Sequence, residues 1–201
     1  MNNRIKRHVY IYLLLYLCIC QVQGQNPQFS FSRKYKNEKL LIAGCGWRKI
    51  AVIDKKTGNP EWEHALGKGE DCNDIELTKE KNILYAYTSG ARLITPSQEV
   101  VWDYKVKAGK EELFTATQLP TGGYLLAICG HPARIVELDK EGNTLKEFQF
   151  KTGIERIHNQ FRQIEKTEHG TYLIPLFATG RLIEINSAGN ILNQVHIGGT
   201  L

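Results

Sequence analysis

The stretch LLIAGCGWRKIAVIDKKTGNPEWEHAL, residues 40–66, decides the fold of this 201-residue chain. It contains an apolar run that ends before Gly46, a second apolar run at 49–54, and a third short strand that carries Trp62. A tight turn at Gly58 joins the last two, because Gly and Asn tolerate the positive φ of hairpin turns. Apolar residues recur at helical spacing nowhere in the chain. The stretch therefore predicts three short antiparallel strands.

The same pattern returns in residues 83–106, 124–150 and 172–197. One equivalent turn position is occupied by Gly58, Gln98, Gly142 and Gly189, at separations of 40, 44 and 47 residues. A further alternating run precedes each later segment, so each unit has four strands. Four strands in about 40–45 residues are typical of a β-propeller blade. We predict an all-β propeller of about four four-stranded antiparallel blades, in preference to a β-sandwich of irregular hairpins.

The predicted blades span approximately residues 29–66, 73–106, 113–150 and 159–197, with Phe29–Phe31 as the first strand. Four blades are few for a propeller, and two interpretations remain open. The chain is half of a larger propeller, either truncated or completed by a second copy, or it is a compact four-blade ring. Open blade edges favour self-association in the first case.

The first 24 residues have the three parts of a secretory signal peptide. A basic start is followed by an apolar run at 9–20 and by a predicted cleavage site after Gly24. The run has twelve residues, whereas a membrane-spanning helix needs about 20. We therefore predict removal of residues 1–24 and export of the propeller domain, residues 25–201, to the periplasm, the cell surface or the medium, with no membrane span in the mature form.

The five cysteines bear on both export and oxidation. Large residues precede Cys18 and Cys20, whereas an acylated lipoprotein cysteine follows a small residue, so lipoprotein anchoring is the weaker alternative. The mature chain keeps Cys45, Cys72 and Cys129. Three is an odd number, so at least one thiol is free or pairs outside the chain. The sequence leaves their disulfide state open.

The net charge changes when the signal peptide is removed. The full chain has 26 basic and 21 acidic residues, a formal net charge of +5. Three of the basic residues lie before residue 25, so the mature chain carries +2. No long basic run remains, which argues against a nucleic-acid partner.

The string D-x-x-T-G-x-x-x-W at residues 54–62 resembles the repeat of the PQQ-like (quinoprotein-type) β-propellers. In that family the Trp docks between neighbouring blades, where its N–H finds a carbonyl. Trp62 and Trp102 hold this place in the first two repeats, and Lys146 and Asn193 in the last two. The full motif appears once, so the resemblance implies a partial or truncated propeller of exported bacterial type, without a quinone or other cofactor. Members of the group include enzymes and non-enzymatic scaffolds.

Basic residues are the leading candidates for a binding site, since Arg offers forked donors to carboxylate or sulfate. Four of them are predicted to share one position before the second strand of each repeat: Lys49, Arg92, Arg134 and Arg181. The loops add Trp47, Arg156 and Asn159 as candidate ligand-binding residues. The alternative is that each cation pairs with an acid of a neighbouring blade in a structural contact.

Two histidines, His131 and His158, are weak candidates for a general base. No metal site is expected, because no His-x-His or Cys-x-x-Cys spacing occurs. Nucleophile elbows, P-loops and dinucleotide fingerprints are also missing from the sequence. These patterns favour a protein without catalytic activity of its own.

We therefore predict an exported propeller scaffold or binding protein, whose partner is a protein, an anionic small molecule or a glycan. One alternative is a propeller transferase or lyase for an anionic substrate, with His131 or His158 as the base and Arg92, Arg134 or Arg156 holding the anion. Another is an inert truncated fragment.

Overall fold

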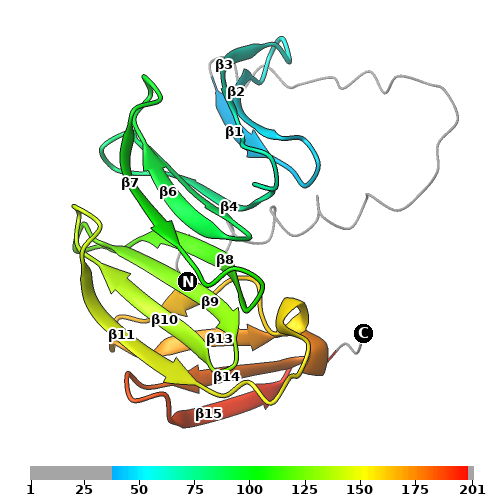
Figure 1. Ribbon diagram of the computed structural model, residues 1–201, viewed down its shortest axis with the longest axis vertical. Coiled ribbons are helices and arrows are strands. Elements are labelled where there is room, and N and C mark those ends of the chain that lie inside the picture. The colour runs from blue at the N-terminus through cyan, green and yellow to red at the C-terminus, as the bar shows by residue number, and fades with distance from the viewer. Residues whose placement is uncertain (1–37, 199–201) are drawn as a thin grey trace, which may run out of the picture. The chain divides into compact units, whose positions relative to one another are not determined.

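The computed structural model describes residues 38–198, in which the strands form four antiparallel sheets, A to D, that follow one another along the chain (Figure 1). Sheet A contains β1 (Lys39–Ala43), β2 (Lys49–Asp54) and β3 (Pro60–Ala65). Sheet B contains β4 (Cys72–Leu77), β5 (Ile83–Tyr87), β6 (Gly90–Ile94) and β7 (Val100–Lys105). Sheet C contains β8 (Glu111–Gln118), β9 (Tyr124–Gly130), β10 (Ala133–Leu138) and β11 (Thr144–Phe150). Sheet D contains β12 (Glu165–Lys166), β13 (Tyr172–Leu176), β14 (Arg181–Ile185) and β15 (Ile191–His196).

The predicted all-β architecture of about four antiparallel blades is confirmed. Sheets B, C and D have four strands each, in sequence order from one edge to the other. Sheet A has three strands within the described part of the chain. The predicted first strand at 29–31 and the predicted signal peptide both lie outside the described residues. Short 3-10 helices, η2 (Ile157–Asn159) and η3 (Phe177–Thr179), occur around and within sheet D.

In sheets C and D, the turn before the last strand also contacts the preceding sheet. Gly142 and Gly189 have φ of +89° and +79°, in the left-handed region that favours glycine. A Cβ atom on Gly142 would lie 2.8 Å from the Cβ of Trp102, and one on Gly189 would lie 2.1 Å from the carbonyl oxygen of Gln149. These turns need glycine both for their backbone conformation and for close packing against the neighbouring sheet.

The two repeat tryptophans lie between sheets. The indole Nε1 of Trp62 donates a hydrogen bond to the Pro96 carbonyl of sheet B at 2.8 Å. Trp102 is buried against Gly142 of sheet C, and its ring centroid lies 5.1 Å from that of Tyr124. In sheet C the equivalent Lys146 instead places its ammonium 5.8 Å from the ring centroid of Tyr172 in sheet D.

The first strands of sheets B and C are joined by side-chain hydrogen bonds. Asp74 Oδ2 accepts from the backbone N–H of Ala116 at 3.2 Å, and Glu76 Oε2 accepts from the N–H of Gln118 at 2.8 Å. Successive sheets also share three clusters of buried apolar side chains. Burial is most complete in sheet C, where every residue of β9 and β10 is buried, and least in β15, which is exposed throughout.

The described residues include no helix that is long and apolar enough to cross a membrane.

Candidate functional site

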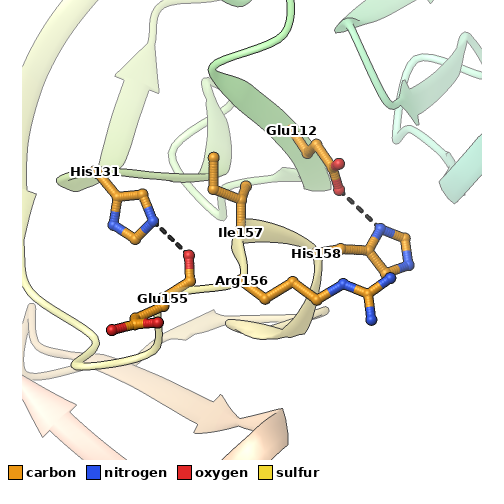
Figure 2. A pocket seen from close by; sticks show the side chains of 6 residues that line it. All are labelled: Glu112, His131, Glu155, Arg156, Ile157 and His158. Carbon is orange, nitrogen blue, oxygen red and sulfur yellow. Dashed lines mark hydrogen bonds and ion pairs between the residues drawn. The ribbon is translucent and has the colours of Figure 1, made fainter.

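An open depression of about 500 Å³ lies where the start of β8, the end of β9 and the connection between sheets C and D meet (Figure 2). Its lining residues are Glu112, His131, Glu155, Arg156, Ile157 and His158. Three of the six were singled out from the sequence as candidates: His131, Arg156 and His158. The structure therefore brings both candidate histidines and one candidate arginine to the same depression.

A buried glutamine holds the connection that carries most of these residues. Gln160 is completely buried, and its Oε1 accepts from the N–H of Gly130 at 2.8 Å. Its Nε2 donates to the carbonyls of Gly130 at 3.0 Å and Ile154 at 3.1 Å. These three bonds fasten the segment before η2 to the end of β9, which immediately precedes His131. The two sides of the depression are thus fixed to each other.

His158 is paired with an acid. Its Nδ1 lies 2.8 Å from Glu112 Oε2, and its ring packs edge-on against Phe114 with centroids 5.4 Å apart. An ionised carboxylate only accepts hydrogen bonds, so the Nδ1 of His158 carries the hydrogen. Its Nε2 is left for other partners on a side chain that is about half exposed.

His131 is held differently, by a backbone group. Its Nε2 lies 2.6 Å from the Glu155 carbonyl, so this nitrogen donates and Nδ1 remains available. Figure 2 shows His131 and His158 at opposite ends of the depression, each directed at its own partner. A general-base role for either histidine stays a prediction.

The four basic residues predicted to share one position are placed in four different sheets. Lys49 forms an ion pair with Glu63 at 2.5 Å, within sheet A. Arg181 contacts Thr179 at 3.2 Å and Gln194 at 3.5 Å, and has no carboxylate partner among the described residues. None of the four lines the depression.

Arg92 departs from the predicted equivalence. In the register between the last two strands of each sheet, one position is shared by Lys49, Arg134 and Arg181. The equivalent residue of sheet B is Gly90. A Cβ atom at residue 90 would lie 2.2 Å from the Tyr104 carbonyl oxygen, so the position has no room for a side chain. Arg92 lies two residues further along β6, where it pairs with Glu70 and Asp103 at 3.0 and 3.2 Å.

Arg134 is the most thoroughly paired of these cations. Its Nε and Nη2 each donate to Glu111 at 2.9 Å, and its Nη1 donates to Glu147 at 2.7 Å. Burial alone would raise the pKa of Glu111, but the hydrogen bonds from Arg134 and from the Lys107 N–H, together with the charges of both cations, outweigh burial and lower that pKa. Both acids belong to sheet C itself, so the pairing is structural, although the predicted partner was an acid of a neighbouring blade.

The other candidates lie outside the depression. Trp47, in the loop between β1 and β2, is about half exposed and packs over Gly44. Asn159 is the last residue of η2, and its N–H donates to the Arg156 carbonyl at 2.9 Å. Neither contributes to the lining of the depression.

Arg162 is a candidate that sequence reasoning missed. Its guanidinium contacts two aromatic rings, 4.2 Å from the centroid of Phe114 and 4.9 Å from that of Phe177. Its Nη1 donates to the carbonyls of Phe161 at 3.0 Å and of His158. The rings come from β8 and η3, far from residue 162 in the sequence, so no local motif signals this stack. Glu155 was missed for a similar reason, since it contributes through its backbone.

The described residues contain no group of three or more His, Cys, Asp or Glu side chains suited to hold a metal ion. Cys45, Cys72 and Cys129 are all free thiols. Burial raises the pKa values of Cys72 and Cys129 to about 12, so both remain protonated at neutral pH. Neither is suited to act as a thiolate nucleophile.

Comparisons with solved structures define the class of protein, a β-propeller. A crystal structure of a protein of unknown function from Bacteroides caccae is 46% identical, with a TM-score of 0.76, over 81% of this chain and 59% of that one. Catalytically inactive virginiamycin B lyase from Staphylococcus aureus, solved with quinupristin, has a TM-score of 0.54 at 12% identity, over 81% of this chain and 57% of the lyase. BamB from Moraxella catarrhalis has a TM-score of 0.52 at 15% identity, over 81% of this chain and 47% of BamB. The last two likenesses concern the fold alone.

The chain belongs to the Mal s 1 allergenic protein-like family, whose model matches residues 39–200. No curated protein matches it. The chain spans between about half and three fifths of the length of these three similar structures.

Proposed function

We propose that this protein is an exported β-propeller that binds a ligand in the depression lined by sheet C and the connection to sheet D, and that it performs no chemistry of its own. The observation that supports this proposal is a difference between arginines in the sheets and histidines in the depression. Arg92 and Arg134, in the sheets, are neutralised by carboxylates. In the depression, His131 and His158 each use one ring nitrogen and keep the other for a ligand.

The ligand classes we propose are an anionic small molecule, a glycan or a protein. The export of the chain and its relation to the PQQ-like repeat belong to the same proposal. They rest on the signal-peptide pattern and on the Trp62 motif, whose indole meets a carbonyl of the next sheet.

A titration followed by amide chemical shifts tests the binding function. The probes are acidic and neutral sugars and short acidic peptides, added to the purified protein. Shifts should concentrate at Glu112, His131 and residues 155–158. The His158→Gln variant should bind more weakly, and the matched exposed variant His169→Gln should bind normally. Shifts confined to other surfaces, or the same affinity in His158→Gln, would contradict the proposal.

An enzymatic function is the second candidate, and the His158–Glu112 pair at 2.8 Å favours it. A carboxylate that orients an imidazole is a common arrangement for a general base. The fold likeness to virginiamycin B lyase is compatible with this candidate. Turnover of a bound ligand that Glu112→Gln abolishes without weakening binding would favour the enzyme over the binding protein.

We also propose self-association through the exposed face of sheet D. A shallow groove on this face is lined by Leu173, Leu182, Glu184, Asn193, Gln194 and Val195. The register places Asn193 where Trp102 stands in sheet B, and there the next sheet covers the face. A second copy would supply an equivalent sheet. The mass in solution tests this: a dimer that Leu182→Lys converts to a monomer is expected, and a monomeric parent protein would overturn it.

A further inference from the structure

We infer that Arg162, together with Arg156 and His158, forms an anion subsite that takes the carboxylate of a small, ring-bearing ligand. This inference rests on the proposed binding function and names the ligand class for the same site. It assigns a role to Arg162, which lies beside the depression.

The guanidinium of Arg162 is held in a fixed position. Thr115 Oγ1 donates to the Arg162 carbonyl at 2.8 Å and accepts from the N–H of Ile164 at 3.2 Å, which fixes the backbone against β8. The rings of Phe114 and Phe177 hold the side chain by cation–π contact. A positioned guanidinium loses little freedom when it binds a carboxylate.

Among the described residues, no carboxylate forms an ion pair with Arg162. Within residues 38–198, Arg92 and Arg134 have carboxylate partners, whereas the hydrogen bonds of Arg162 go to two backbone carbonyls. Both bonds use Nη1, so Nη2 and Nε keep their donors. Burial lowers the pKa of Arg162, and the nearby Glu112 carboxylate offsets this only in part. The nearby Glu112 is bound to His158.

Arg162 adjoins the depression through His158, which lines it together with Arg156. The His158 carbonyl accepts its hydrogen bond, so the two residues are in contact. Arg156 also lines the depression, and Figure 2 draws no interaction from its guanidinium to either acid there. Phe177 is 46% exposed and offers an apolar surface next to the charge. A ligand with a carboxylate and a ring matches this combination.

Benzoate and benzamide are a matched pair of probes, because they share a ring and differ in charge. We expect benzoate to shift the Arg162 Nε–H and His158 resonances, with at least tenfold weaker binding of benzamide. Arg162→Gln should weaken benzoate binding at least tenfold, and Arg162→Lys by less. The exposed Arg48→Gln serves as the charge-matched control and should leave binding unchanged. A thermal melt of each variant checks folding, and Arg156→Gln replaces Arg162→Gln if the latter fails to fold.

The outcomes separate the two proposals. Equal binding of benzoate and benzamide, or benzoate binding that survives Arg162→Gln, overturns the anion subsite and leaves the binding function standing. Benzoate that shifts no resonance at the depression also overturns the subsite. If none of the sugars and peptides of the earlier titration binds there either, the binding function fails as well.

Discussion

Arg134 and Arg162 lie in neighbouring parts of the molecule but have opposite surroundings. Arg134 is buried in sheet C and meets two carboxylates, one of them through two hydrogen bonds. The Arg162 guanidinium contacts two phenylalanine rings, and its hydrogen bonds within the described residues go to carbonyl oxygens. The charge of Arg134 is neutralised within sheet C, whereas the guanidinium of Arg162 forms no ion pair among the described residues. This difference in ion pairing is the reason we assign Arg134 to the fold and propose Arg162 for binding.

The largest effect is expected for stability, when the ion pairs of Arg134 are removed. Arg134→Met should lower the free energy of unfolding by about 3–5 kcal/mol, because it leaves the buried Glu111 carboxylate without its partner. Urea denaturation gives the value. The double variant Arg134→Met/Glu111→Met should recover much of the loss. A single variant within about 1 kcal/mol of the parent would show that the pair is not needed for stability.

Gln160→Leu removes the hydrogen bonds that join the end of β9 in sheet C to the segment before η2. It should cost about 1–3 kcal/mol, because the buried N–H and carbonyl of Gly130 lose their partners. Ligand binding at the depression should also weaken, since the segment before η2 is no longer fastened to β9. Denaturation and the ligand titration measure the two effects. Full stability together with full affinity would contradict the anchoring role.

Asp74 extends the comparison to carboxylates, because burial raises its pKa to about 6 while backbone N–H groups are its partners. With an ordinary pKa near 3.8 in the unfolded chain, the folded protein binds the extra proton between about pH 4 and 6. The stabilising contribution is therefore complete below pH 4 and is lost as the pH rises through about 6.

The expected loss is about 2 kcal/mol, discounted for partial exposure. It is measured as the difference in pH dependence between the parent protein and Asp74→Asn, which should lack this contribution. Glu111 should behave oppositely, because its lowered pKa gives stability that is lost as the pH falls. A difference curve that rises from pH 4 to 7 would contradict the assignment.

The smallest effect is expected at Arg162. Arg162→Gln removes a cation–π stack but no carboxylate pair, so the free energy of unfolding should change by about 1 kcal/mol or less. Its effect on ligand binding should be much larger. A loss of stability as large as that of Arg134→Met would make Arg162 an architectural residue.

Much of the fold could be predicted from the sequence, because each hairpin is a local event. The turn residues around Gly58, Gly142 and Gly189 indicate the repeats. The Trp62 motif predicts how neighbouring sheets contact each other. The predicted equivalence of Arg92 with Lys49, Arg134 and Arg181 was wrong. The strand register shows that Gly90 is the equivalent residue of sheet B, at a position with no room for a side chain.

The site was only partly predictable. His131, Arg156 and His158 stand on loops, where polar residues draw attention. Arg162 gave no such signal, because its surroundings are assembled from Phe114 and Phe177, each about 15 residues or more away in the chain. Whether a cation is paired depends on tertiary contacts, and a single sequence does not contain them.

The hydrogen bonds between the first strands of sheets B and C have a dynamic consequence. Asp74 and Glu76 accept from the amides of Ala116 and Gln118, which belong to the neighbouring sheet. Separation of the two sheets removes the acceptors of these amides, so we expect their exchange to report the opening of the interface. Their protection should match that of the buried β9 amides, which would make sheets B and C one cooperative unit.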